Sequence, residues 1–268
     1  MYTSVPHVVN VPYTPYTETY NSINSIIVQL DQPLTLEQAV TKVQGDDGLT
    51  TIVLGRGKHQ INSNNLEISS AMNIVGDPSV SRADIVILGG IHFKKGIQGN
   101  CHLQHLTLRQ AKGHGVLGES SFTMEEVLVD QCTYSGVSAW GDGVVGRCTN
   151  VEVRQCGMSG VCASSGASIT LIGKTTVHHN CTEGLSADHG LQVYGSSSST
   201  IRLVSPLTKE IVSVGNGGGG EWGARHGANI DNIKNIEAMG EANGNGQTGL
   251  TKENYVLQGY TTVNTLRF

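Results

Sequence analysis

A repeat with a period of 21 to 24 residues constrains this chain more than any other feature of its sequence. Four glycines, each followed by an aliphatic residue, recur at intervals of 21, 24 and 24 residues. Aliphatic residues such as Val129 and Val153 recur at fixed offsets before these glycines. A unit this short cannot bury its own apolar face, so successive units must stack on one another. The four glycines are Gly115, Gly136, Gly160 and Gly184.

Within each unit, apolar and polar residues alternate over short patches, which is the pattern of a β-strand with one buried face. Three short strands make one triangular coil, and stacked coils lie about 4.8 Å apart. The repeat therefore predicts an all-β, single-domain parallel β-helix of roughly seven coils, each of roughly 21–26 residues. In this fold Val129, Val153 and Val177 are vertical neighbours in the interior.

Both ends of such a solenoid need caps, because the outermost coils expose unpaired strand edges. Thr35 and Gln38 have the spacing of a capping box and begin an apolar pattern typical of a short helix. Proline and tyrosine are frequent before this helix, and glycine and asparagine dominate after Gly215. We therefore expect an extended arm over 1–33, a β-helix with an amino-terminal capping helix over 34–215, and an irregular carboxyl-terminal cap over 216–268.

The composition argues against several classes of protein. Charged residues make up 15% of the chain, against about 25% in an average protein. The formal net charge of −5 argues against a nucleic-acid partner, and no apolar segment reaches the roughly 18 residues of a membrane-spanning helix. The six cysteines lack the spacing of a zinc site, and we expect them to be buried and inert. No signal-peptide pattern is visible, so we expect an intracellular, cytoplasmic protein.

The start of the repeat resembles a known family. The motifs are LEQAV at 36–40, DDGLTTIVL at 46–54, GKHQI at 57–61 and MNIVG at 72–76. Together they resemble the opening of right-handed parallel β-helix proteins of the pectate-lyase-like superfamily. This superfamily includes the β-helix domains of F-box and adaptor proteins. The resemblance implies a right-handed coil, but the fold hosts lyases, hydrolases, epimerases and non-enzymatic binding modules.

Stacking also places polar residues in columns. Arg109, Asp130, Arg154 and His178 share one column, which indicates a surface ladder of alternating charge worth roughly 0–1 kcal/mol per pair. The resemblance to pectate lyases implies another interpretation, in which Asp130 and Glu152 bind Ca²⁺. Arg154 or Arg109 would then remove the proton next to a uronate carboxyl. His178 is a further candidate acid or base.

The adjacent residues His178 and His179 are also a candidate metal or acid–base pair. Neighbouring residues of a strand point to opposite faces of the sheet. We therefore expect that these two side chains cannot bind one metal ion together.

A second candidate site lies at an irregular corner of the coil, just after the aligned glycines. An exposed tryptophan beside charged side chains could stack on a sugar or dock a protein. The alternative is that this tryptophan packs over a neighbouring turn. The candidate ligand-binding residues are Trp140, Asp142, Glu119, Asp188 and His189.

Two functions follow from these patterns. The leading hypothesis is a non-enzymatic binding or scaffold module that recognises a protein or a polysaccharide through a rigid lateral surface, with no cofactor. The alternative is a carbohydrate-active enzyme, a Ca²⁺-assisted lyase or an epimerase, that acts on an acidic polysaccharide. The alternative requires at least three carboxylates near one point. Neither hypothesis involves nucleic acid or a membrane, and both leave the oligomeric state open.

Overall fold

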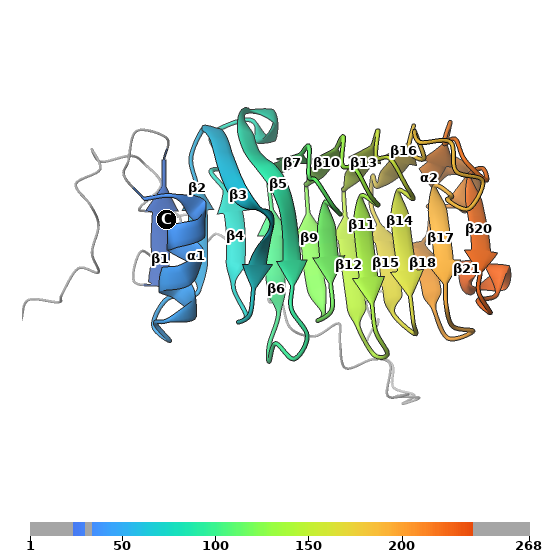
Figure 1. Ribbon diagram of the computed structural model, residues 1–268, viewed down its shortest axis with the longest axis horizontal. Helices are drawn as coiled ribbons and strands as arrows, with labels where there is room; N and C mark the ends of the chain where they lie inside the picture. The colour runs from blue at the N-terminus through green and yellow to red at the C-terminus, as the bar shows by residue number, and fades with distance from the viewer. Residues whose placement is uncertain (1–23, 30–33, 238–268) are drawn as a thin grey trace, which may run out of the picture. The chain divides into compact units, whose positions relative to one another are not determined.

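The computed structural model describes residues 24–29 and 34–237, which form a right-handed parallel β-helix (Figure 1). The predicted fold class is thereby confirmed. The solenoid has about six turns, slightly fewer than the sequence predicts. The irregular turns lie at the ends. There, β3 (Gly57–Ile68) and β5 (Ile85–Phe93) are long unbroken strands, and the short helix α2 (Lys209–Val212) interrupts the last turn.

One wall of the solenoid is a nine-stranded parallel sheet. Its strands, in spatial order, are β1 (Ser25–Val28), β2 (Thr51–Leu54), β4 (Asn73–Gly76), β6 (Cys101–Gln104), β9 (Phe122–Glu125), β12 (Val145–Thr149), β15 (Ser168–Ile172), β18 (Thr200–Val204) and β21 (Ile233–Ile236).

The other two walls belong to a twelve-stranded sheet that divides into two branches at β5. The β7 branch contains β7 (Thr107–Arg109), β10 (Leu128–Asp130), β13 (Glu152–Arg154), β16 (Thr176–His178) and β19 (Ser213–Val214). The β8 branch contains β8 (Val116–Gly118), β11 (Val137–Trp140), β14 (Val161–Ser164), β17 (Leu191–Tyr194) and β20 (Trp222–Arg225). Strand β3 pairs with β5.

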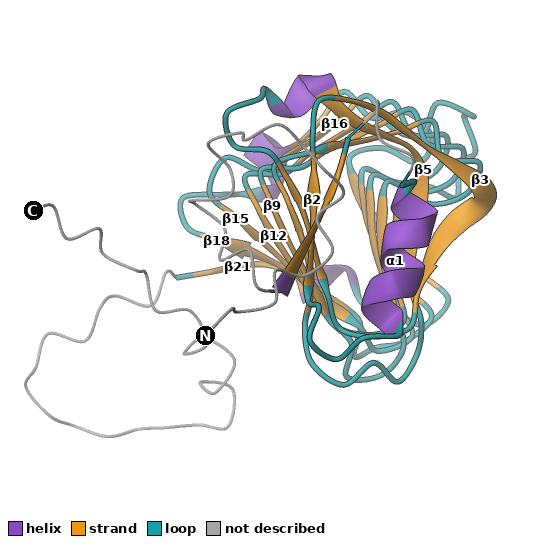
Figure 2. Ribbon diagram, turned by 90° about the vertical axis from the view of Figure 1, so that its left-hand side faces the viewer, coloured by secondary structure: helices purple, strands orange, loops and turns teal. Residues whose placement is uncertain are grey.

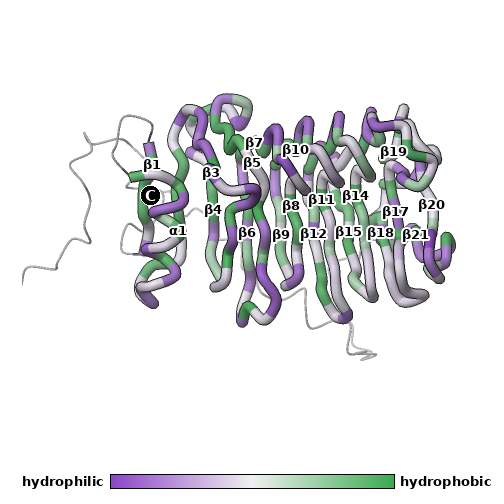
Figure 3. Tube along the Cα trace, in the orientation of Figure 1, coloured by the Kyte–Doolittle hydropathy of each residue, from purple (hydrophilic) through white to green (hydrophobic). Residues whose placement is uncertain are grey.

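Columns of aliphatic side chains fill the interior, as the repeat predicts. Val129 lies in register with Val153, and Val153 with Val177. All three side chains are fully buried. Hydrophobic residues recur along the strands, and hydrophilic residues gather at the turns (Figure 3). The expected vertical neighbours are therefore confirmed.

Residues in the left-handed conformation form one corner of the coils. The residues that follow β7, β10, β13 and β16 have φ angles between 54° and 57°. A single left-handed residue turns the chain sharply, and the next side chain then points inward. Small buried side chains at that next position therefore stack on one another. The corner residues are Gln110, Gln131, Gln155 and His179, and the inward residues are Ala111, Cys132, Cys156 and Asn180.

The predicted alignment has the wrong glycine at its fourth position. Leu191 lies in register with Val161, so the counterpart of Gly160 is Gly190 and not Gly184. The turn between β16 and β17 is six residues longer than the alignment assumed. A Gly-Leu pair occurs at both places, but Leu185 is 47% exposed whereas Leu191 is buried.

The helix α1 (Leu36–Gln44) covers the amino-terminal end of the coil (Figure 2). Thr35 and Gln38 form the predicted capping box, and one face of the helix joins the apolar core. Within the range expected to be an extended arm, Ser25–Val28 forms β1 and pairs with β2. At the other end, β20 and β21 extend both sheets beyond residue 215.

Residues 1–23, 30–33 and 238–268, which belong to the expected arm and cap, lie outside the described residues. Within the described ranges, no helix is long and apolar enough to cross a membrane. The short 3₁₀ helices η3 (Arg82–Asp84) and η4 (Ile230–Asn232) lie in turns between strands.

Candidate functional site

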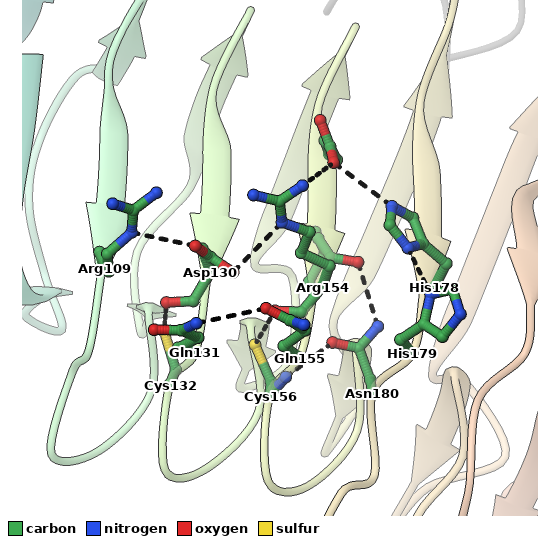
Figure 4. Close-up of polar contacts among 12 residues, drawn as sticks. Arg109, Asp130, Gln131, Cys132, Arg154, Gln155, Cys156, His178, His179 and Asn180 are labelled. Carbon is green, nitrogen blue, oxygen red and sulfur yellow. Dashed lines mark hydrogen bonds and ion pairs between the residues drawn. The ribbon is translucent and has the colours of Figure 1, made fainter. Parts of the chain in front are cut away.

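The charged column of the β7 branch is a continuous network of ion pairs (Figure 4). Asp130 is its centre, because its side chain is only 3% exposed and lies between two arginines. Arg109 Nε donates to Asp130 Oδ2 at 2.9 Å, and Arg154 Nε donates to Oδ1 at 3.2 Å. The predicted ladder of alternating charge therefore exists, but its central carboxylate is buried and not on the surface.

Glu152 continues the network on the next coil. Its Oε1 accepts a hydrogen bond from Arg154 Nη1 at 3.1 Å and lies 3.3 Å from His178 Nε2. Its Oε2 accepts from Arg82 Nη2 at 3.3 Å. Sequence reasoning missed Arg82, because this residue lies in η3, outside every column of the repeat. The hydroxyl of Thr107 donates to the Arg82 carbonyl and holds this segment against the sheet.

These contacts do not fit the calcium site that the resemblance implied. Both oxygens of Asp130 and both oxygens of Glu152 already contact cationic or imidazole nitrogens. Ca²⁺ takes six to eight oxygen ligands, usually including several carboxylates. No cluster of three or more histidine, cysteine or acidic side chains suited to a metal occurs among the residues described. The guanidinium groups of Arg109 and Arg154 are likewise engaged, so neither is placed as a free base.

His178 and His179 do not point to opposite faces, as the alternation of a strand predicted. His179 has a φ of 54°, and this left-handed turn brings both rings to the outer surface. Their Nδ1 atoms lie 2.8 Å apart and their ring centres 5.1 Å apart (Figure 4). When two ring nitrogens are 2.8 Å apart, the ring centres reach a separation of 5.1 Å only if each nitrogen lies on the side of its ring that faces the other ring. The two Nδ1 atoms therefore point at each other. This is the geometry of one proton shared in a hydrogen bond.

The cysteines have no nucleophilic environment. Burial raises the pKa of Cys148 to about 12 and that of Cys162 to about 12. Burial also raises the pKa of Cys101 to about 11. A thiol with such a pKa is protonated at neutral pH and is a poor nucleophile. Cys132, Cys156 and Cys181 are also buried, whereas Cys162 is only partly buried on β14, so the interpretation as buried packing residues holds for five of the six cysteines.

The second candidate site contains exposed aromatic residues at the carboxyl ends of the strands of the β8 branch. Trp140, Ser164, Tyr194 and Arg225 occupy one column, in register from β11 to β20. Trp140 is 51% exposed and Tyr194 is 38% exposed. The tryptophan is therefore about half exposed, and its indole N–H reaches Ser165 in the turn of the next coil.

Hydrogen bonds and ring contacts hold these aromatic residues in place. The indole Nε1–H of Trp140 donates to Ser165 Oγ at 2.8 Å, and Ser165 Oγ lies 3.3 Å from Ser164 Oγ. The ring of Tyr194 lies 4.7 Å from the ring of His226. We call Trp140, Ser164, Ser165, Tyr194 and His226 the aromatic corner.

Two of the other predicted ligand-binding residues lie near the aromatic corner. Asp142 is in the turn that follows Trp140, and its carboxylate lies over the backbone of Gly166. Glu119 follows β8, one coil before Trp140, but its Oε2 lies 2.9 Å from His92 Nε2. Glu119 is therefore engaged with the preceding coil.

Asp188 and His189 do not belong to this corner. Both lie in the long turn before β17, at the opposite end of the strand from Tyr194, because the fourth glycine was misaligned. Burial raises the pKa of Asp188, whose carboxylate lies 3.5 Å from Ser159 Oγ. Burial likewise lowers the pKa of His189, whose ring packs against the backbone of Gly223. The same misalignment hid Tyr194, which shares a column with Trp140 only when Leu191 is aligned with Val161.

Comparison with known proteins finds some solved structures of low similarity and no relative by sequence. No protein-family model matches the sequence, and no curated protein matches it. The structure is similar to the catalytic domain of a GH87 alpha-1,3-glucanase in complex with nigerose, with a TM-score of 0.35 and 14% sequence identity. A variant of that domain in complex with tetrasaccharides has a TM-score of 0.32, also at 14% identity. Each match covers 74% of this chain and 43% of the other, so this chain spans less than half of those domains.

Proposed function

We propose that this protein is a non-catalytic glycan-binding module and that the aromatic corner stacks on sugar rings. The observation that carries the proposal is the column shared by Trp140 and Tyr194, both exposed and two coils apart. Two coils correspond to about 9.6 Å along the solenoid axis. A single exposed aromatic residue is ordinary on a protein surface, but two in one column form a platform.

The polar groups around these rings support a sugar ligand. Aromatic rings offer apolar faces, whereas the hydroxyls of Ser164 and Ser165 can donate to or accept from sugar hydroxyls. The hydrogen bond to Ser165 restrains the Trp140 ring before any ligand arrives. A ring that is already ordered loses less conformational entropy on binding.

The charged network of the β7 branch supports a binding role over catalysis. Its two carboxylates are engaged with arginines, which leaves neither oriented toward an incoming substrate. An acid–base pair for glycoside hydrolysis needs two carboxyl groups flanking the scissile bond. The lyase alternative needs free carboxylates and a free base, and the same contacts argue against it.

Screening of the full chain against an array of soluble oligosaccharides, followed by titration calorimetry of the hits, tests this function. Trp140→Ala should weaken binding of a hit by at least tenfold, because the sugar ring that stacks on the indole loses its platform. Tyr134→Ala is the matched control, since Tyr134 is 43% exposed but lies at a different corner. Equal losses in both variants would contradict the proposal.

A second measurement separates binding from catalysis. Incubation of the protein with polyuronates, with and without added Ca²⁺, should leave the ultraviolet absorbance of unsaturated products at the buffer level. If such products accumulate, and if Arg154→Ala abolishes their formation, the protein is a lyase and not a binding module.

A further inference from the structure

One column on the outer face of the nine-stranded sheet contains three cationic side chains. Arg147, Thr170, Arg202 and Lys234 lie in register on β12, β15, β18 and β21. The residues on either side of each arginine are buried, so the arginine side chains point outward. We call these four residues the cationic column.

The three cations of this column are Arg147, Arg202 and Lys234. Within the described part of the chain, none of them has a partner in an ion pair or in a side-chain hydrogen bond. By contrast, Arg82, Arg109 and Arg154 are all paired on the β7 branch. Between β9 and β21 the strands of this sheet contain one acidic residue, Glu125. The face is therefore positive in a protein whose formal net charge is −5.

A second column runs beside the first, two residues further along each strand. It consists of Thr149, Ile172, Val204 and Ile236, all partly exposed. The two columns are about 6.6 Å apart along the strand direction. We call this second set the apolar column. A positive stripe beside an apolar stripe suits a partner with the complementary pair of stripes.

We infer that this face docks an amphipathic α-helix of a protein partner, with an acidic stripe on the cationic column and an apolar stripe on the apolar column. Successive coils are about 4.8 Å apart, and successive turns of a helix are about 5.4 Å apart. A helix laid along the solenoid axis therefore keeps near register with both columns. An extended peptide repeats its side chains on one face every 6.6–6.8 Å or so, and it loses register after one coil.

The apolar column distinguishes a helix from a simple polyanion. A sulfated polymer needs only the cations, whereas an amphipathic helix also buries its apolar stripe against Ile172 and Val204. The proposal is independent of the aromatic corner, which belongs to the other sheet.

The test uses the full chain and a fluorescent synthetic helical peptide with one glutamate stripe and one adjoining leucine stripe. A peptide of the same composition in scrambled order is the matched probe. Anisotropy should show binding of the striped peptide only. Arg202→Glu should weaken this binding at least tenfold, and Lys112→Glu, an exposed site outside this face, by less than twofold.

The double variant Ile172→Thr, Val204→Thr keeps β-branched side chains in both strands and should weaken the striped peptide at least threefold. Three results would overturn the proposal. These are no binding of the striped peptide, equal binding of both peptides, or binding of dextran sulfate that depends on Arg202 while the double variant binds the striped peptide as the wild type does. The last result would assign the face to polyanions.

Discussion

At the scale of single residues, Asp130 shows how position in a coil changes the role of a common side chain. Its column suggested a solvent-exposed ladder, yet the carboxylate is almost completely buried between Arg109 and Arg154. A buried carboxylate is tolerated when charged donors satisfy both of its oxygens. The network therefore links neighbouring coils along the β7 branch.

Replacing Asp130 by Asn should lower the free energy of unfolding by about 1–3 kcal/mol. One of the two acceptor oxygens becomes an NH2 donor that faces an arginine, and the oxygen that remains carries no charge. Glu126→Gln makes the same chemical change at a carboxylate whose side chain is 50% exposed beside His105. It should cost about 1 kcal/mol or less. Urea denaturation of both variants measures the difference. If the two variants lose the same amount of stability, burial of Asp130 does not strengthen its ion pairs.

At the scale of the elements, the capping helix α1 closes an end that would otherwise expose core residues. Its buried face contributes Leu36, Ala39, Val40 and Val43 to the core of the first coil. The capping box fixes where the helix begins, because Thr35 and Gln38 each bond to the backbone of the other.

Thr35→Ala should lower the free energy of unfolding by about 1 kcal/mol, because it removes the acceptor for the Gln38 amide. Thr35→Ser keeps the hydroxyl and should restore most of the loss. Thermal denaturation followed by circular dichroism provides the comparison. An alanine variant as stable as the serine variant would show that the cap is dispensable.

At the scale of the whole solenoid, each coil contacts only its neighbours, so stability is roughly a sum over coils and their interfaces. Asp130 and Arg154 occupy equivalent positions on successive coils. Residues 131–154 therefore make one complete coil.

Deletion of residues 131–154 should leave a folded but less stable β-helix, since Gln155 then follows Asp130 as Gln131 does now. The far-ultraviolet circular dichroism should keep its β-sheet shape, and the unfolding transition should remain cooperative. Deletion of 143–154, about half a coil, breaks the register of every later strand and should prevent folding. If both deletions fold equally well, the coil register does not determine the fold.

Most of the fold could be predicted because its core repeats. The offsets that relate Val129, Val153 and Val177 are visible in the sequence, and stacking at a fixed interval turns them into contacts. The prediction failed where the interval changed. The long turn before Gly190 could not be recognised, because a Gly-Leu pair occurs at both candidate positions and only burial distinguishes them.

The sequence by itself determined that the chain forms a stacked parallel coil, which residues face its interior, and that Trp140 lies at an irregular corner. These properties repeat along the chain, so local pattern is sufficient to reveal them. Only the tertiary structure decided that Arg82 reaches Glu152, that Tyr194 joins the column of Trp140, and that Arg147 and Arg202 have no partner among residues 24–29 and 34–237. Such contacts depend on turn lengths and on left-handed corner residues, and no repeat in the sequence encodes them.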